Sequence, residues 1–194
     1  MSMMSYVPDP APFRPRFARP PLVLAVEPPL TPLALRRRLN PAIAAEIRSA
    51  AETDQLDAVV APYGERRPGW RSAPLWSEPL ALYVGRKHPL AASTSIEAAD
   101  LARTTLTTCG GWTGVLLAGL GVSPAHIHYS RDWRDVAALV SEGFGVVIAG
   151  RSAADAFGAD VHIRPIDGWL TYCAYWPDGG DTPALRRLLE HPHG

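Results

Sequence analysis

The chain has 194 residues, of which 47% are hydrophobic, so it can bury one sizeable core or two small lobes and is neither fibrous nor wholly disordered. Its 19 basic and 19 acidic side chains cancel, so composition provides no basic field to hold a nucleic acid backbone. No apolar run approaches the roughly 20 residues of a membrane helix, and two distant cysteines without a secretory segment predict reduced thiols in a cytoplasmic protein.

The first 21 residues are rich in proline and arginine and show no apolar period. This composition predicts an extended or disordered arm. Its dispersed arginines, Arg14, Arg16 and Arg19, could touch nucleic acid or a membrane, but a solvated leader explains them more simply. We therefore expect the arm to stand apart from the folded unit.

The next segment has the pattern of an α/β unit. Residues 22–26, LVLAV, form an apolar run typical of a strand that is buried on both faces. After a Glu-Pro-Pro turn, Thr31 is expected to cap a helix over residues 33–39, with proline at the first helical position. Residues 43–47 are a weaker strand candidate and residues 57–61 a stronger one.

The stretch EPLALYVGRKHPLA, residues 78–91, follows a segment at residues 69–77 that reads as a loop rich in tryptophan, arginine and proline. Its first half alternates in the manner of a half-buried strand, and residues 86–89 end that strand in a tight turn. A short helix is expected at residues 96–101.

A second lobe is expected to begin with a strand at residues 104–108 and a glycine-rich turn. A short helix is expected next at residues 115–120. A strand is then expected around the alternating His126 and His128. In residues 130–150, Asp132 is the expected N-cap, Gly143 the expected helix end, and one helical face carries Trp133, Val136, Ala137 and Val140.

The remainder of the chain reads as strands and a closing helix. An apolar strand is expected over residues 144–149. Further strands are expected over residues 161–166 and 170–176, and a turn of proline, aspartate and glycine follows. Thr182 then predicts the cap of a last helix.

Residues 78–91 resemble the strand and "HPLA" turn of effector-binding domains of LysR-type transcriptional regulators. LDAVVAP, the ADL helix and the helix, Gly-Phe-Gly, strand segment stand in the same order in this family and in the chain. The resemblance covers about residues 21–190 and implies an α/β fold of two lobes with two crossover strands, as in type 2 periplasmic binding proteins. It implies one lobe from residues 22–103 plus 165–194, and a second from residues 104–164.

The chain departs from that family in two ways. LysR regulators begin with a winged helix-turn-helix and a linker helix, whereas only the proline-rich arm precedes residue 22 here. The sequence thus predicts a stand-alone effector domain without direct nucleic acid binding. The family also places a full helix before the LDAVVAP strand, for which only residues 50–56 are available, so the first lobe is expected to be short.

Four segments that follow strand ends are expected to meet in a cleft between the lobes, where ligands of such sheets bind. Their hydroxyls, free amides and one guanidinium suit a carboxylate or similar anion, and Trp112 and Tyr63 suit an aromatic ring. The structural alternative is that the threonines cap helices, the glycines only turn the chain and the arginine is solvated. The candidate ligand-binding residues are Glu27, Thr31, Tyr63, Thr107, Thr108, Cys109, Gly110, Trp112, Thr113 and Arg151.

Other chemistry is weakly indicated. His126 and His128 could share a metal, but no carboxylate or cysteine stands at ligand spacing, so no metal or other cofactor is predicted. Cys109 before a helix could have a lowered pKa and act as nucleophile or redox sensor, although the sequence offers it no partner histidine or resolving cysteine.

Three functions follow from this interpretation. The leading one is a binding module that holds a small anionic or aromatic molecule and acts through dimerisation, with itself or with a partner regulator. The second is an enzyme acting on a small carboxylate, since the two-lobed fold serves catalysis in chorismate dehydratase; Glu27, Cys109 and Arg151 would then carry the chemistry. The third is an interaction module or relic without a ligand.

Overall fold

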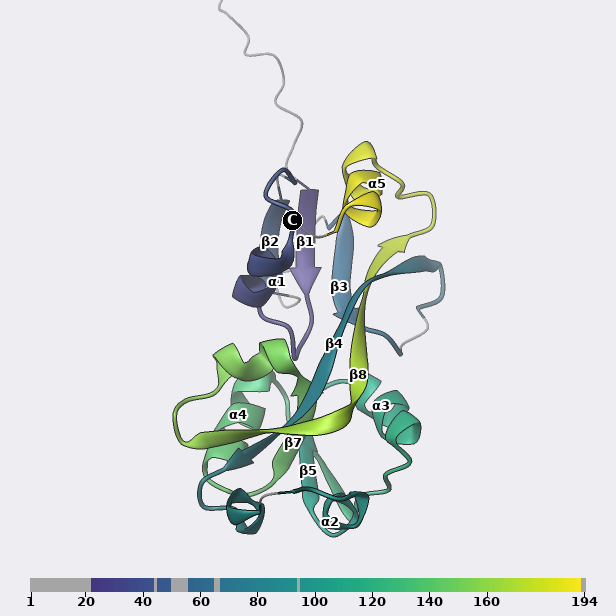
Figure 1. Ribbon diagram of the computed structural model, residues 1–194. Coiled ribbons are helices and arrows are strands. Elements are labelled where there is room, and N and C mark those ends of the chain that lie inside the picture. The colour runs from purple at the N-terminus through teal and green to yellow at the C-terminus, as the bar shows by residue number, and fades with distance from the viewer. Residues whose placement is uncertain (1–21, 44, 50–55, 65–66, 94, 193–194) are drawn as a thin grey trace, which may run out of the picture.

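The computed structural model describes residues 22–43, 45–49, 56–64, 67–93 and 95–192. The expected N-terminal arm, residues 1–21, and most of the segment 50–56 lie outside this part. One mixed sheet of eight strands, in the order β2-β1-β3-β8-β4-β7-β5-β6, runs through the described chain. Figure 1 shows β1, β2 and β3 in its upper half and β5 and β7 in its lower half, with β4 and β8 passing through both.

The first lobe contains three parallel strands, β1 (Leu22–Val26), β2 (Ala45–Ser49) and β3 (Ala58–Pro62). Helix α1 (Pro32–Arg38) follows β1, and α5 (Pro183–Glu190) ends the described chain. The apolar residues of both helices pack on the same core cluster as alternate residues of β1. The βαβ start and the closing helix expected from the sequence are therefore present.

The second lobe contains the parallel strands β5 (Thr105–Thr108), β6 (His126–Tyr129) and β7 (Val146–Gly150). In chain order, its helices are η1 (Pro89–Ala92), α2 (Ala98–Ala102), α3 (Trp112–Leu120), α4 (Trp133–Ser141) and η2 (Arg151–Ala156). Expected and observed element ends differ by a few residues, which is ordinary because helix and strand ends fray.

Two long antiparallel strands join the lobes, β4 (Trp70–Gly85) and β8 (Val161–Pro177). In the first lobe β8 pairs with β3, and in the second lobe β4 pairs with β7 through residues 80–84. The α/β fold with two crossover strands, expected from the sequence, is confirmed. The lobe boundaries expected at residues 103/104 and 164/165 stay a prediction.

The interpretation of residues 69–77 as a loop is wrong. This segment is the first half of β4, paired with β8 from Trp70 opposite Pro177 onward. Prolines interrupt strand ladders unless they stand at edges or bulges, and the register of β4 shifts beside both Pro74 and Pro79. The composition therefore suggested a loop where bulges accommodate the prolines. Similarly, the two expected late strands are one strand, β8, in which Gly168 has a φ of 134°.

The second half of β4 is buried on both faces, rather than half-buried as its alternation suggested. Leu80, Leu82 and Val84 belong to the main core cluster. Ala81 and Tyr83 face a second cluster, to which α4 contributes Val136 and Val140. The sequence pattern was misleading because alanine and glycine on the second face look solvent-tolerant, whereas here they allow α4 to pack closely against the strand.

The expected helix caps are confirmed. The Thr31 hydroxyl accepts a hydrogen bond from the Ala34 amide at 3.1 Å. The Asp132 carboxylate accepts hydrogen bonds from the backbone amides of Arg134 and Asp135 at the start of α4. The Thr182 hydroxyl caps α5 in the same way. These polar residues satisfy helix-end amides that would otherwise lack a partner.

The close packing of β4 against α4 depends on Gly85, because a Cβ at this position would clash with the carbonyl of Val140. We expect Gly85→Ala to lower the free energy of unfolding by about 1 to 3 kcal/mol, since the helix backbone would have to move. Urea denaturation followed by circular dichroism measures this change. Gly158→Ala is the matched control, because its Cβ would meet nothing within 4 Å; an equal effect of both variants would contradict the packing argument.

Candidate functional site

The structure distributes the candidate ligand-binding residues over three places at the boundary of the lobes. Glu27 and Tyr63 lie beside one cavity, the residues from Thr107 to Thr113 form the β5–α3 connection, and Arg151 lies beside another cavity. Thr31 uses its hydroxyl in the cap of α1. Whether these residues bind a ligand is not decided by their positions and stays a prediction.

The first place is a cavity of about 860 Å³ below the end of β3. Glu27 makes an ion pair with Arg67 at 2.6 Å, and the Arg67 guanidinium lies over the Tyr175 ring at 5.1 Å. The Tyr63 side chain is 62% exposed at the rim. Both lobes contribute to this cavity, because its lining extends to Val115 of α3.

In the second place, the β5–α3 connection, some polar side chains bind each other and others have no partner within the described chain. The hydroxyls of Thr108 and Thr113 lie 2.5 Å apart, and both residues are buried. The Thr107 hydroxyl and the Trp112 indole nitrogen are buried and have no hydrogen-bond partner within the described chain. Gly110 is exposed with a φ of 112°, so it serves the turn. The hydroxyls of Thr108 and Thr113 thus bind each other, and the Thr107 hydroxyl is left without a partner within the described chain.

Cys109 does not have the lowered pKa that the sequence suggested. Burial raises its pKa to about 11, with smaller contributions from the Asp132 and Asp135 carboxylates. A protonated thiol is a poor nucleophile and a poor redox sensor. The suggested lowering of its pKa is therefore wrong, while a place for Cys109 in ligand binding stays a prediction.

The third place is a cavity of about 330 Å³ between α1 of the first lobe and η2 of the second. Three guanidinium groups line it, those of Arg37, Arg38 and Arg151. Arg37 pairs with Asp155 at 2.7 Å across the lobe boundary. Arg151 is exposed; its backbone carbonyl accepts a hydrogen bond from the Tyr83 hydroxyl at 3.2 Å, whereas its guanidinium makes no hydrogen bond or ion pair with any residue that the structure describes. One positive charge at this cavity is therefore uncompensated.

Glu78 lies behind this cavity and was not among the candidates. Its side chain is 1% exposed, and its carboxylate accepts hydrogen bonds from Arg38 at 2.5 Å and from the Ser152 hydroxyl at 2.7 Å. The Ser152 amide lies 3.3 Å from both carboxylate oxygens. A Cβ on Gly150 would clash with the carboxylate, so a larger residue there would force the Glu78 side chain to move. The only sequence signal was a glutamate at the start of a strand that proved to be buried.

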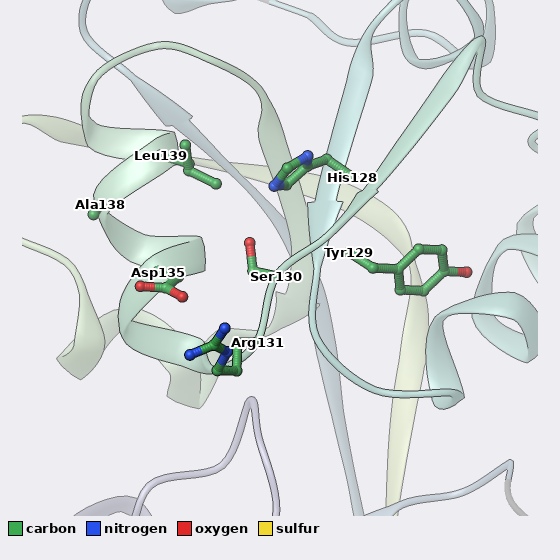
Figure 2. A pocket seen from close by; sticks show the side chains of 7 residues that line it. All are labelled: His128, Tyr129, Ser130, Arg131, Asp135, Ala138 and Leu139. Carbon is green, nitrogen blue, oxygen red and sulfur yellow. The ribbon is translucent and has the colours of Figure 1, made fainter.

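A further hollow of about 590 Å³ lies between β6 and α4, away from the predicted site residues. Figure 2 shows the His128 ring pointing toward Leu139 across this hollow, while the Tyr129 ring points away from α4. His128 packs edge-on against Phe144, with ring centroids 5.8 Å apart. Within the described residues no group of three or more His, Cys, Asp or Glu side chains could hold a metal ion.

Most of the chain also matches the model of a known protein family. The model described as LysR substrate binding domain matches residues 31–192. No curated protein matches the chain.

Solved structures show the same fold. The reduced OxyR regulatory domain from Pseudomonas aeruginosa is 20% identical with a TM-score of 0.63, over 87% of this chain and 92% of that one. CbnR, a LysR family transcriptional regulator, is 23% identical with a TM-score of 0.65, over 88% of this chain and 68% of that one. The BenM effector binding domain with its effector benzoate is 18% identical with a TM-score of 0.61, over 87% and 88% of the two chains. The chain spans 64% of a full-length OxyR variant, C199D.

Removing the charge of Glu78 is expected to destabilise the fold. Glu78→Gln keeps the shape but leaves Arg38 without its counter-ion, and since Arg38 is 35% exposed we expect a loss of about 2 kcal/mol. Urea denaturation measures the change in the free energy of unfolding. Glu142→Gln is the control, because its pair with Lys87 is exposed on both sides; it should leave the midpoint nearly unchanged. A Glu78→Gln midpoint within error of the control would contradict this role.

Both buried thiols are expected to resist alkylation in the folded protein. Burial raises the pKa of Cys109 and of Cys173 to about 11 from 9.0. Because the folded pKa is the higher one, the contribution to stability is complete below about pH 9 and is lost as the pH rises toward about 11. Iodoacetamide at about pH 8 should therefore modify the native chain far more slowly than the urea-unfolded chain, as followed by mass spectrometry. Equal rates would refute this.

Proposed function

The chain belongs to the LysR substrate binding domain family, and we propose on this basis that it binds a small anionic molecule in the cavity between α1 and η2. The observation that carries the proposal is the convergence of Arg37, Arg38 and Arg151 on one cavity. Guanidinium groups form bidentate, charge-assisted hydrogen bonds with carboxylates. Of these three arginines, Arg37 and Arg38 pair with a carboxylate of the described chain and Arg151 does not, so Arg151 is the proposed ligand residue.

The position of the cavity supports a role in which ligand binding changes the protein. Its lining comes from α1 on one lobe and η2 on the other. A molecule bound there contacts both lobes and favours whichever lobe arrangement gives it the better contacts. Effector binding of this kind is the common feature of the family, and the ligand is the finer part that we propose.

We propose aromatic molecules as a second ligand class, for the larger cavity near β3 and not for the cavity between α1 and η2. The larger cavity near β3 contains the exposed Tyr63 together with Trp70 and Tyr175. Aromatic side chains in a cavity supply area and stacking for a planar group. BenM, a structural neighbour, was solved with benzoate as its effector. Aromatic acids are therefore included in the ligand panel to test this second cavity.

The partners expected from the sequence belong to the same proposal. We propose that the protein acts by forming a homodimer or by joining a partner regulator, which the transcriptional role of the family supports. Direct contact with nucleic acid is not proposed, because the 19 basic and 19 acidic residues balance. Free, buried cysteines support a reducing, cytoplasmic location. No helix in the described part of the chain is long and apolar enough to cross a membrane.

No single observation favours the enzyme alternative over binding. Glu27 is held by Arg67, Cys109 has a raised pKa, and Arg151 lies at a different cavity from Glu27. These three residues do not line one cavity together. Geometry for an acid, a base or a nucleophile beside one substrate is what that alternative would require.

The binding proposal is tested by a thermal-shift screen against small carboxylates, aromatic acids and acyl metabolites. A ligand that binds only the folded state raises the melting temperature. For a carboxylate that binds here, we expect Arg151→Ala to reduce the affinity roughly tenfold to a hundredfold, because a charge-assisted bidentate contact is lost.

Arg187→Ala is the matched control, since Arg187 is an exposed residue of α5 outside the cavity. It should retain wild-type affinity. Equal loss in both variants, or full binding by Arg151→Ala, would refute the assignment. No stabilisation by any acid in the panel would favour the ligand-free interaction module.

A further inference from the structure

We infer that the cavity between α1 and η2 selects ligands that carry a single negative charge, and that Asp155 determines this selectivity. The inference rests on the proposed function and narrows its ligand class. It concerns the balance of charge around the cavity, which includes the buried carboxylate behind it. The two parts can fail separately, and the experiment below distinguishes them.

The charges around the cavity leave room for one anionic group. Arg37, Arg38 and Arg151 provide three positive charges. Asp155 is bound to Arg37 at 2.7 Å and Glu78 to Arg38 at 2.5 Å. The remaining positive charge is that of Arg151, so a monoanion neutralises the group.

A second negative charge on the ligand would have to displace a carboxylate of the protein. Displacing Glu78 is costly, because its side chain is 1% exposed and also accepts hydrogen bonds from Ser152. A buried charge without its counter-ion is strongly unfavourable. The Arg38 guanidinium therefore stays paired with Glu78 and is not available to bind the ligand.

Asp155 is the weaker of the two carboxylates that compete with a ligand. Its side chain is 36% exposed, and that of Arg37 is 61% exposed, so water screens this pair. Even so, its negative charge stands at the cavity and repels a second ligand carboxylate over several ångströms. Removing this charge, while keeping the side chain's size, frees Arg37 for the ligand.

The volume and lining also limit the ligand. About 330 Å³ is near the lower limit of small-molecule cavities. Ala34 and Ala154 are the apolar residues of the lining. A short acyl chain with one carboxylate fits this combination of one free guanidinium and small apolar side chains.

Three probes of equal chain length test the inference by calorimetric titration of the full chain at about pH 7.5: butyrate as monoanion, succinate as dianion and butyramide as neutral analogue. For the wild type we expect butyrate to bind at least about tenfold more tightly than butyramide and no less tightly than succinate. In Asp155→Asn the ratio of succinate to butyrate affinity should rise roughly threefold to tenfold, because Arg37 becomes available.

Asp160→Asn is the matched control. It removes the same charge from the same lobe, but Asp160 is 73% exposed, pairs with Arg86 and lies outside the cavity lining. The affinity ratio should be unchanged in this variant. A ratio that rises equally in both variants, or succinate binding more tightly than butyrate in the wild type, overturns the inference while leaving the proposed anion site in place.

The proposed function fails in a different way. If butyrate and butyramide bind equally, or if neither acid binds the wild type at millimolar concentration, the cavity is not an anion site for small acids. Arg151→Ala, titrated with butyrate in parallel, supplies the same information from the protein side. That outcome overturns both statements, whereas a change of the affinity ratio in Asp155→Asn alone supports both.

Discussion

The buried carboxylate of Glu78 is the interaction on which the interlobe region depends. It stands on β4, a crossover strand, and binds Arg38 of the first lobe and Ser152 of the second. A buried ion pair contributes little net stability compared with an apolar substitute, but it tolerates few alternative geometries. Glu78 therefore links α1 to η2 through Arg38 and Ser152. Gly150 meets the steric requirement that this carboxylate imposes.

The two crossover strands explain why such a contact is effective. β4 and β8 pair along nearly their whole length, so each strand is part of both lobes. A shift of η2 relative to α1 must be taken up by Glu78, by the Arg37–Asp155 pair, or by these strands. The cavity with the free Arg151 lies at the same place. In the proposed function, these few residues would couple the charge of the ligand to the arrangement of the lobes.

How much of this could be predicted varies with the type of signal. Local patterns gave the caps at Thr31 and Asp132 and the order of the elements, because capping and apolar periodicity act within a few residues. They failed at residues 69–77, where pairing with β8 overrides a composition typical of loops. The candidate site was also drawn as one cleft, whereas the structure separates its members among two cavities and a buried connection.

By itself, the sequence determined the α/β class, the family and the order of most elements, since each rests on the order and spacing of neighbouring residues. Arg151 was also identified as a candidate, because it follows the end of a strand. Only the tertiary structure decided which charges are compensated. Arg38 and Glu78, 40 positions apart, become partners when the chain folds, as do Arg37 and Asp155 at 118 positions. Electrostatic pairing depends on distance in space and on burial, and neither quantity is encoded in local spacing.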